Sequence, residues 1–492
     1  MKIIHCVTIF AISVAVMLIA IPGFTIAQEE IPPMELWDFW GPPLMPEPEG
    51  LERKTLVFDG IGEREWYVYK PKSYTGKKSV PLVVAVHGGG LNGLIYSRYT
   101  TWSLIADREG FMVIYPSSPN DRWNAYYQFP DDPANPGAPD DLNYLKMLIE
   151  KTCDDYNIDK GRIYMQGHSM GDMMTSHFAV SFPGMLAAAA PNSGPVSLEM
   201  MTDINGDPIS PPSVPVPIYR WHGELDDLGL GGPRQEIDDI QKQYWIEQNG
   251  CNPIPTLCIN GRYNTEIYSC EGAEFRFTEY VGGKHGLNQS AANVIWNDFF
   301  SRFARSADGR IIKLKGPKNR FHKYHGLHSM IDMGCNEGVA LLVGTPYALV
   351  DGNIIEMEVA PIIIEPVDPP AGERVPVEER ADRLLVPLSF INDVFKVKVK
   401  WSDENGNIKI RHADKIGILT IDTPIMVIND DAITQLVLNP QIIDNIVMVP
   451  LKSIAENILE KNVAYSTGAM YVSDHEAQID KATAHILNKI LN

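Results

Sequence analysis

The chain has 492 residues, of which 45% are hydrophobic and 21% are charged. These values are ordinary for a folded globular protein, and the length allows two to four domains. Acidic residues outnumber basic ones by 62 to 42, which gives a formal net charge of -20. Because such a surface repels phosphate groups, the composition argues against nucleic acids and anionic membranes as partners.

The first segment has the organisation of a secretory signal peptide, which we place at residues 1–27. Lys2 precedes an apolar run over residues 7–21, and the small residues that signal peptidase needs stand directly before Gln28. A secreted protein without a membrane span after cleavage is therefore expected. The alternative is an N-terminal membrane anchor, although the run is short for a bilayer span. Residues 28–50 are rich in proline, glutamate and tryptophan and should form an extended lead-in.

Segments with strand and helix patterns alternate after residue 51. Residues 54–58 and 65–69 predict an antiparallel hairpin, since strand-favouring residues flank a turn at Asp59-Gly60. Continuous apolar runs, such as residues 81–86, predict strands that are buried on both faces. Alternating strands and helices indicate a parallel sheet with right-handed crossovers. Further strands are expected at residues 111–115, 163–167, 186–190, 218–221 and 275–281, and helices at residues 102–109, 140–157, 173–178 and 293–303.

The most informative stretch is a G-x-S-x-G pattern between a predicted strand and a predicted helix. Gly167 and Gly171 lack the side chains that would collide where a strand reverses into a helix, so Ser169 can stand exposed at the turn. A serine in this position is a candidate nucleophile. The backbone N–H of Met170, which follows it, is a candidate donor to a developing oxyanion.

A glycine run follows the buried strand at residues 81–86. It reads His87-Gly88-Gly89-Gly90, and its glycines could be ordinary loop residues. Because glycine lets the backbone approach a ligand closely, the N–H groups of Gly88 and Gly89 are candidates to complete an oxyanion hole with Met170.

A serine nucleophile needs a general base, and the base needs an acid that orients it. When the order along the chain is nucleophile, acid and histidine, Asp226 is the candidate acid for Ser169, since it follows a predicted strand end. Asp227 and Glu224 lie in the same loop and remain alternatives.

His285 is the candidate base because it follows the last predicted strand of the region. His222 and His168 lie inside glycine-containing motifs and are expected to make structural hydrogen bonds. His168 is also a candidate substrate-binding residue because it precedes the nucleophile. Trp123 and Tyr126 are further candidates, since aromatic rings could stack on an acyl group or a sugar, or could simply be packed.

Five cysteines remain after the signal peptide, and three of them cluster in a loop-like stretch. Cys251 and Cys270 form the preferred disulfide, and the odd count leaves at least one free thiol. A zinc site is the rival interpretation, but the spacing lacks a C-x-x-C pair. Three histidines at residues 322, 325 and 328 are read as a solvated segment. We therefore expect no metal.

The succession of motifs resembles the α/β-hydrolases of the polyhydroxybutyrate depolymerase and feruloyl esterase group over residues 51–305. The resemblance implies an α/β-hydrolase fold with a mostly parallel sheet, a Ser-His-Asp triad and no cofactor. The chain departs from the group at Asp172, where a second glycine is usual. The motifs that carry the resemblance are residues 67–71, 81–90, 110–116, 123–124, 140–141, 167–171 and 222–226.

The rest of the chain contains an internal repeat after a polar linker at residues 306–338. Residues 339–474 hold two units, each with T-P, a strand pair and V-P-L before a helix. They resemble the copper amine oxidase N-terminal-like or stalk domain and form a smaller α+β domain. Neither unit supplies a histidine cluster for copper, so cell-surface association or a spacer role is expected. Residues 475–492 should form a C-terminal helix.

The resemblance implies a secreted serine carboxylic ester hydrolase. Its substrate would be a feruloyl or acetyl ester of plant cell-wall polysaccharide, or a short aliphatic polyester. A serine peptidase on the same fold is one alternative, because the triad is shared. A surface-binding protein with a vestigial hydrolase is another, although Ser169, Asp226 and His285 are all present.

Overall fold

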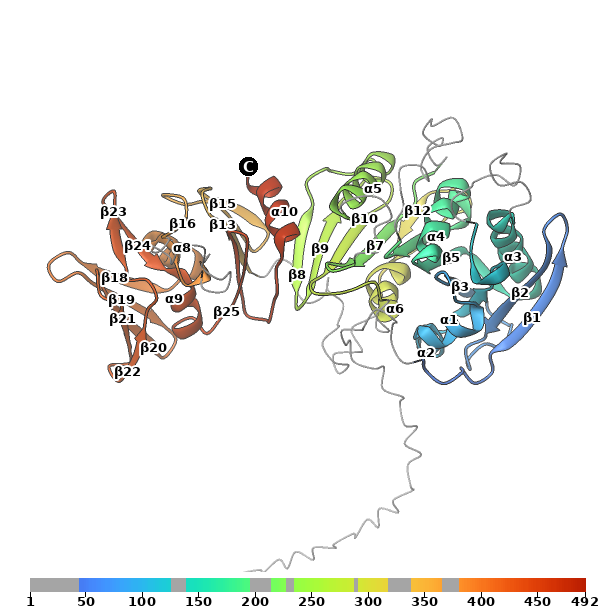
Figure 1. The fold of residues 1–492 in the computed structure, drawn as a ribbon, viewed down its shortest axis with the longest axis horizontal. Coiled ribbons are helices and arrows are strands. Elements are labelled where there is room, and N and C mark those ends of the chain that lie inside the picture. Colours follow the sequence, from blue (N-terminus) through green and yellow to red (C-terminus); the bar gives the residue numbers. More distant parts are fainter. Residues whose placement is uncertain are drawn as a thin grey trace, which may run out of the picture.

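The computed structural model describes residues 44–124, 139–194, 214–226, 234–286, 291–316, 338–364 and 380–492. The molecule is elongated, with an N-terminal part up to residue 316 and a C-terminal part from residue 338 at opposite ends (Figure 1). The predicted signal peptide, most of the lead-in, Tyr126 and the three histidines of the linker lie outside the described residues.

A ten-stranded sheet forms the centre of the N-terminal part. Its strands are β1 (Glu52–Phe58), β2 (Gly62–Tyr69), β3 (Val80–Val86), β4 (Met112–Pro116), β5 (Ile158–His168), β6 (Ala188–Asn192), β7 (Ile218–Gly223), β8 (Thr256–Asn260), β9 (Tyr263–Tyr268) and β10 (Phe275–Tyr280). They are arranged in the order β1-β2-β4-β3-β5-β6-β7-β10-β9-β8. The strands from β4 to β10 in this order are parallel, and antiparallel pairs flank them on both sides.

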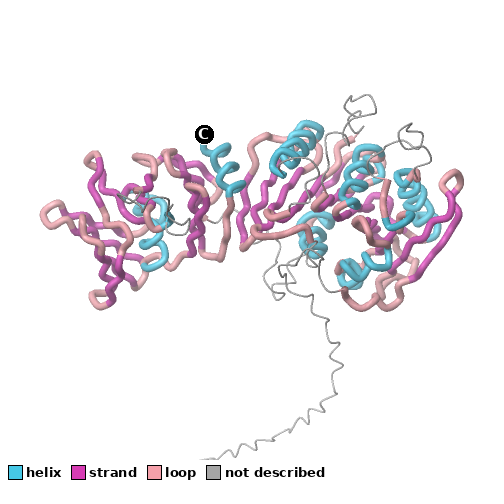
Figure 2. The backbone as a smooth tube through the Cα atoms, viewed as in Figure 1, coloured by secondary structure: helices cyan, strands magenta, loops and turns pink. Residues whose placement is uncertain are grey.

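Helices cover both faces of this sheet, as Figure 2 shows. One face carries α3 (Asp141–Asp155), α4 (Met170–Ser181) and α5 (Arg234–Gln248), and its core includes Leu145, Met174 and Trp245. The other face carries α1 (Gly93–Tyr99), α2 (Trp102–Glu109) and α6 (Ala291–Val294), which continues as η4 (Ile295–Phe299) and η5 (Phe300–Arg302). Helices on both faces of a mostly parallel sheet confirm the predicted α/β class.

Two short helical turns and a small ribbon complete the N-terminal part. The turns are η1 (Pro119–Asp121) and η2 (Pro183–Met185). The ribbon pairs β11 (Phe303–Arg305) with β12 (Ile311–Lys313) in antiparallel fashion. The strand β12 therefore lies inside the segment from residue 306 that was expected to be a linker. Arg305 of β11 holds the ribbon in position, because its side chain donates hydrogen bonds to the backbone oxygens of Leu186 and Pro215.

The C-terminal part consists mainly of strands. They are β13 (Val339–Leu342), β14 (Tyr347–Val350), β15 (Asn353–Glu356), β16 (Ile362–Ile363), β17 (Leu384–Pro387), β18 (Lys398–Ser402), β19 (Asn407–His412), β20 (Lys415–Thr420), β21 (Ile425–Ile428), β22 (Ala432–Gln435), β23 (Gln441–Ile443), β24 (Ile446–Pro450), β25 (Asn462–Ser466) and β26 (Ala469–Ser473). They form sheets in the orders β15-β14-β13-β26-β25, β16-β17-β24-β23 and β18-β19-β20-β21-β22.

Two helices lie between these sheets. They are α8 (Leu388–Phe395) and α9 (Leu451–Asn457), and each begins directly after the proline of a V-P-L motif. Because proline lacks an N–H and has a fixed φ, it suits a helix start. Leu341, Ile391, Ile408 and Ile454 meet in one apolar core, so the two sequence repeats share a single interior.

The C-terminal helix α10 (Lys481–Leu491) joins the two parts. It begins with a capping box between Asp480 and Thr483, and Thr483 accepts a 2.7 Å hydrogen bond from the side chain of Asn264 in β9. Leu487 of α10 belongs to an apolar cluster that contains Leu257 and Ile259 of β8. The edge of the ten-stranded sheet is thereby covered. None of the helices within the described ranges is long and apolar enough to cross a membrane.

Candidate active site

Ser169 occupies a strained turn between β5 and α4. Its φ is 56° and its ψ is -118°, a conformation that few residues other than glycine adopt. The two glycines of the motif make this turn possible by close approach. A side chain at Gly167 would collide with the carbonyl group of Gly171, and one at Gly171 would collide with that of Val86. The hydroxyl group therefore projects at the carboxyl end of a central strand.

Three side chains that are distant in the sequence meet at this turn. The Nε2 atom of His285 lies 3.0 Å from the Oγ atom of Ser169, and its Nδ1 atom lies 3.0 and 3.1 Å from the two carboxylate oxygens of Asp226. Asp226 and His285 are 3% and 9% exposed. They follow β7 and β10, which are parallel neighbours, so their loops emerge at the same edge of the sheet.

The competing residues lie elsewhere. Glu224 accepts a hydrogen bond from the backbone N–H of Gly282, and Asp227 is outside the described residues. His222 is held between Asp238 and Glu279, at 3.2 and 2.9 Å. These contacts are the structural hydrogen bonds expected of His222.

The glycine loop passes directly beside the nucleophile. A side chain at Gly88 would lie 3.3 Å from the Cβ atom of Ser169, and one at Gly89 would collide with the side chain of Met170. The absence of side chains at these two positions lets the backbone of the loop approach the serine closely. His87 anchors the start of the loop, because its ring accepts a 3.1 Å hydrogen bond from the backbone N–H of Ser118. Burial lowers the pKa of His87 to about 4.

Trp123 lies beneath the glycine loop. It is 2% exposed, its ring centroid lies 4.7 Å from that of His87, and its indole N–H donates to the backbone oxygen of His87 at 2.8 Å. The ring is thus packed, which was the second of the two roles considered for it. Tyr126, the other aromatic candidate, lies outside the described residues.

His168 lies between Tyr99 and the base. Its ring centroid is 6.0 Å from that of Tyr99 and 5.0 Å from that of His285. Its Nε2 atom lies 3.2 Å from the backbone oxygen of His285, while no described residue bonds its buried Nδ1 atom. Burial lowers its pKa to about 3, so it is neutral at neutral pH. His168 therefore positions the backbone of the base.

The departure at Asp172 is explained by an arginine that sequence reasoning missed. Arg220 in β7 forms two hydrogen bonds with the carboxylate of Asp172, at 3.1 and 3.2 Å, and both side chains are almost fully buried. The backbone N–H of Gly194 and the hydroxyl of Ser176 donate to the same carboxylate. The pair ties the helix behind Ser169 to two neighbouring strands. The sequence feature that could have indicated this ion pair is the presence of an arginine inside an otherwise apolar predicted strand.

Replacing Arg220 by leucine should destabilise the protein by about 3–5 kcal/mol, because it leaves the Asp172 carboxylate buried without its main counterion. Urea-induced unfolding, followed by tryptophan fluorescence, measures this loss. Arg310→Leu is the matched control, since Arg310 forms an exposed ion pair with Asp308 and should matter little. Equal stability of the Arg220→Leu and Arg310→Leu variants would contradict the structural role of the buried pair.

The structure shows the state of some of the cysteines, with one disulfide and one free thiol among the described residues. Cys251 and Cys270 form a disulfide, and Cys153 is the free cysteine among the residues that the structure describes. The bond joins the end of α5 to the loop after β9. Over the same residues, no group of three or more histidine, cysteine and acidic side chains is arranged to hold a metal ion.

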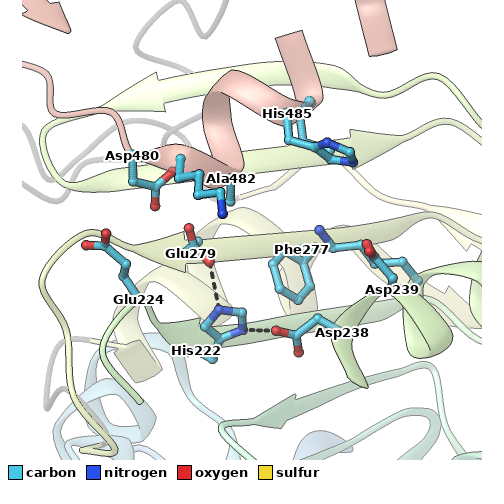
Figure 3. A pocket seen from close by; sticks show the side chains of 12 residues that line it. His222, Glu224, Asp238, Asp239, Phe277, Glu279, Asp480, Ala482 and His485 are labelled. Atoms are coloured by element: carbon cyan, nitrogen blue, oxygen red, sulfur yellow. Dashed lines mark hydrogen bonds and ion pairs between the residues drawn. The ribbon is translucent and has the colours of Figure 1, made fainter. Parts of the chain in front are cut away.

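A cavity of about 320 Å³ lies away from Ser169, between the N-terminal part and α10 (Figure 3). His222, Glu279 and Lys242 line it from the sheet and α5, and Asp480 and His485 line it from the C-terminal segment. The carboxyl groups of Glu279 and Asp480 both line this cavity. Burial, together with the neighbouring Glu279 carboxyl group, raises the pKa of Asp480 to about 7. Because residues of both parts line the cavity, the ionisation of Asp480 should affect how stably the two parts are packed together.

Asp480→Asn should make the protein more stable than the wild type above pH 7, by on the order of 2 kcal/mol. Because the pKa of Asp480 is higher in the folded state, the wild type loses stability as the pH rises from about 4 to about 7. Asparagine keeps a neutral partner for Glu279 at every pH, so the two proteins should converge near pH 4.

Thermal or urea unfolding at pH 4, 6 and 8 measures the difference between the wild type and Asp480→Asn. Asp474→Asn is the control, since Asp474 is an exposed acid of the same segment. A stability difference that does not change with pH would contradict the raised pKa of Asp480.

Two segments of the chain match known families. Residues 66–209 match the esterase PHB depolymerase family, and residues 371–473 match the copper amine oxidase N-terminal domain. Both resemblances predicted from the sequence are thus confirmed. Each match covers less than half of the chain.

Curated relatives are similar to the N-terminal part. A bifunctional acetylxylan esterase/xylanase of Neocallimastix patriciarum is 30% identical over 264 residues, which are 50% of this chain and 34% of the relative. Feruloyl esterase B of Neurospora crassa is 32% identical over 149 residues, 30% of this chain and 49% of the relative. The chain therefore spans between a third and a half of these relatives' length.

A solved structure, the acetyl xylan esterase from Aspergillus awamori, is also similar to part of the chain. It has 20% sequence identity and a TM-score of 0.38, with 48% of this chain and 94% of that chain covered.

Proposed function

We propose that this chain is a secreted serine hydrolase of carboxylic esters. The observation that carries the proposal is the unbroken series of hydrogen bonds from Ser169 through His285 to Asp226, with the serine on a strained turn. The curated relatives, which are named as acetylxylan and feruloyl esterases, support the ester as the bond that is cleaved.

In the first step, Ser169 attacks the ester carbonyl while His285 takes its proton as general base. Asp226 accepts the Nδ1–H of His285, which holds the imidazole in the tautomer that leaves Nε2 free to accept. The backbone N–H groups of Met170 and of Gly88 or Gly89 bind the developing oxyanion. His285 then protonates the alcohol that leaves, and an acyl-enzyme remains.

In the second step, a water molecule takes the place of the alcohol. His285 removes a proton from this water, which attacks the acyl carbon, and the proton returns to Ser169 as the acid leaves. All the groups required are side chains and amides of this chain, so the proposed reaction consumes only the ester and water.

The substrate class that we propose is the acetyl or feruloyl esters of plant cell-wall polysaccharide. The names of the relatives, which are acetylxylan and feruloyl esterases, support it. The C-terminal part is proposed to be a spacer or surface-association element, because its match is to a domain outside the hydrolase. Secretion rests on the signal-like segment at residues 1–27.

A panel of substrates tests the proposal. The purified protein is assayed on acetylated xylan, methyl ferulate, a short hydroxybutyrate oligomer and a peptide amide, with a Ser169→Ala variant as the blank. Turnover of acetylated xylan or methyl ferulate well above the blank is expected. Faster cleavage of the peptide amide than of every ester would mean that the chain is a peptidase, and no turnover at all would refute the hydrolase proposal.

A further inference from the structure

The outer face of the sheet β18-β19-β20-β21-β22 lies at the end of the molecule far from the ten-stranded sheet (Figure 1). Ile408, Leu419 and Met426 are fully buried in the core on the inner face. Because side chains alternate along a strand, their neighbours point to the outer face. We call this surface the distal face. Its side chains include a basic half and an aliphatic half. The basic half is Lys398, Lys400, Lys409 and Arg411, and the aliphatic half is Ile416, Ile418, Ile425, Val427 and Ile433.

The strand register aligns the two halves in one row. The row crosses all five strands, with two lysines followed by three aliphatic residues. Its members, each paired with the next, are Lys400, Lys409, Ile418, Val427 and Ile433. With neighbouring strands about 4.8 Å apart, the row is about 19 Å long. Ile433 is 71% exposed, and the four basic residues are exposed without an ion-pair partner among the described residues.

The internal repeat supplies an equivalent row on the other five-stranded sheet. The shared T-P pair aligns Ala340 with Ile418 and Leu349 with Val427. The strands pair in the same way, and the equivalent row is Ala464, Tyr471, Ala340, Leu349 and Ile354. The two rows therefore differ mainly where Ala464 and Tyr471 are replaced by lysines.

The equivalent row, which contains Tyr471, Ala340 and Leu349, is covered by other parts of the chain. Helix α10 packs across it and contacts β13, β14, β25 and β26. Ile486 and Leu487 of this helix form an apolar cluster with Ala340 and Tyr471. The exposed side of the helix carries Lys481, His485 and Lys489. Within this chain an amphipathic helix therefore covers this type of sheet face, together with Leu257 and Ile259 of β8.

We propose that the distal face binds an amphipathic helix of a partner protein, with apolar residues on one side and carboxylates along one flank. The apolar side would cover Ile418, Val427 and Ile433, while the carboxylates would pair with Lys400 and Lys409. Carboxylates complement the charges of Lys400 and Lys409, so the replacement of Ala464 and Tyr471 by lysines within the repeat favours an acidic partner.

Two other occupants fit the distal face less well. Sugar binding favours aromatic rings that stack, and the row of the distal face contains aliphatic side chains instead. An anionic bilayer would attract the four basic residues, but the chain as a whole carries a net charge of -20 and is repelled from such a surface.

A pair of stapled helical peptides tests the proposal. Both have the sequence of residues 480–492, and the acidic peptide carries Lys481→Glu, Asn488→Glu and Asn492→Glu, at exposed positions that border one flank of the apolar side. Fluorescence anisotropy measures their binding to the whole chain at moderate salt. The acidic peptide should bind at least about tenfold more tightly than the unchanged peptide.

Two variants of the chain localise the binding. Lys400→Glu with Lys409→Glu should weaken binding of the acidic peptide by about tenfold or more, and Ile433→Ser should also weaken it. Lys77→Glu with Lys78→Glu, at exposed lysines of the N-terminal part, is the matched control and should bind as the wild type does.

Three results would overturn the proposal: no binding of the acidic peptide, equal binding of both peptides, or binding that is unchanged by the Lys400 and Lys409 substitutions. Vesicles that contain phosphatidylserine are assayed in parallel by sedimentation. Lysine-dependent binding to these vesicles in place of the acidic peptide would assign the face to a membrane and would also overturn the proposal.

Discussion

Ser169→Ala should lower the rate of ester hydrolysis by about four to six orders of magnitude, since the covalent step is lost and only substrate binding and the oxyanion donors remain. The fold should survive. The strained φ of 56° is imposed by the glycines around the turn, and alanine adopts it at the same cost as serine. The measurement is turnover of a soluble ester by the purified variant, beside its thermal unfolding temperature.

The control for Ser169→Ala is Ser389→Ala, at an exposed serine of the C-terminal part that bonds Glu358. It should keep full turnover. A fluorophosphonate probe adds an independent readout, because it should label the wild type and Ser389→Ala at one serine and leave Ser169→Ala unlabelled. If Ser169→Ala were folded and retained more than about a hundredth of the wild-type rate, another group would have to be the nucleophile.

Asp226→Asn should lower turnover by about four orders of magnitude with little effect on the fold. The asparagine amide can donate to Nδ1 of His285, which would stabilise the tautomer whose Nε2 carries a proton. That nitrogen then cannot accept the proton of Ser169, although it lies only 3.0 Å away. The rate of hydrolysis as a function of pH is measured together with the maximal rate.

Glu224→Gln is the matched control for Asp226→Asn, because Glu224 is an acid of the same loop whose carboxylate bonds the N–H of Gly282. Glutamine preserves this acceptor, so turnover should stay within about threefold of the wild type. A larger loss in Glu224→Gln than in Asp226→Asn would assign the orienting acid to Glu224 instead.

Local patterns in the sequence were sufficient for the elements around the serine. The helix at residues 102–109 was predicted at its observed bounds, and Gly110 ends it with a φ of 79°. The predicted G-x-S-x-G turn is present because its glycines act through contacts with backbone that is close along the chain or in the adjacent strand. The V-P-L motifs likewise mark both helices of the repeat, since proline constrains its own residue.

Contacts between distant segments required the tertiary structure. The proximity of His285 to Asp226 depends on β7 and β10 being neighbours, although β8 and β9 lie between them in the sequence. The same dependence explains why the Arg220 partner of Asp172 was missed, and why residues 311–313 were expected to be a linker rather than a strand.

Local sequence patterns were therefore enough for the alternation of strands and helices around Ser169, the turn that presents it and the duplication of the C-terminal part. They were not enough for β8 and β9, which lie in a stretch that was expected to be loop-like. The tertiary structure alone decided which strands are neighbours, which acid faces the histidine, and that one repeat face is covered by α10 while the equivalent face is exposed. The physical reason is that propensity and side-chain periodicity act over a few residues. The pairing of distant segments depends on how whole faces pack, which no short stretch encodes.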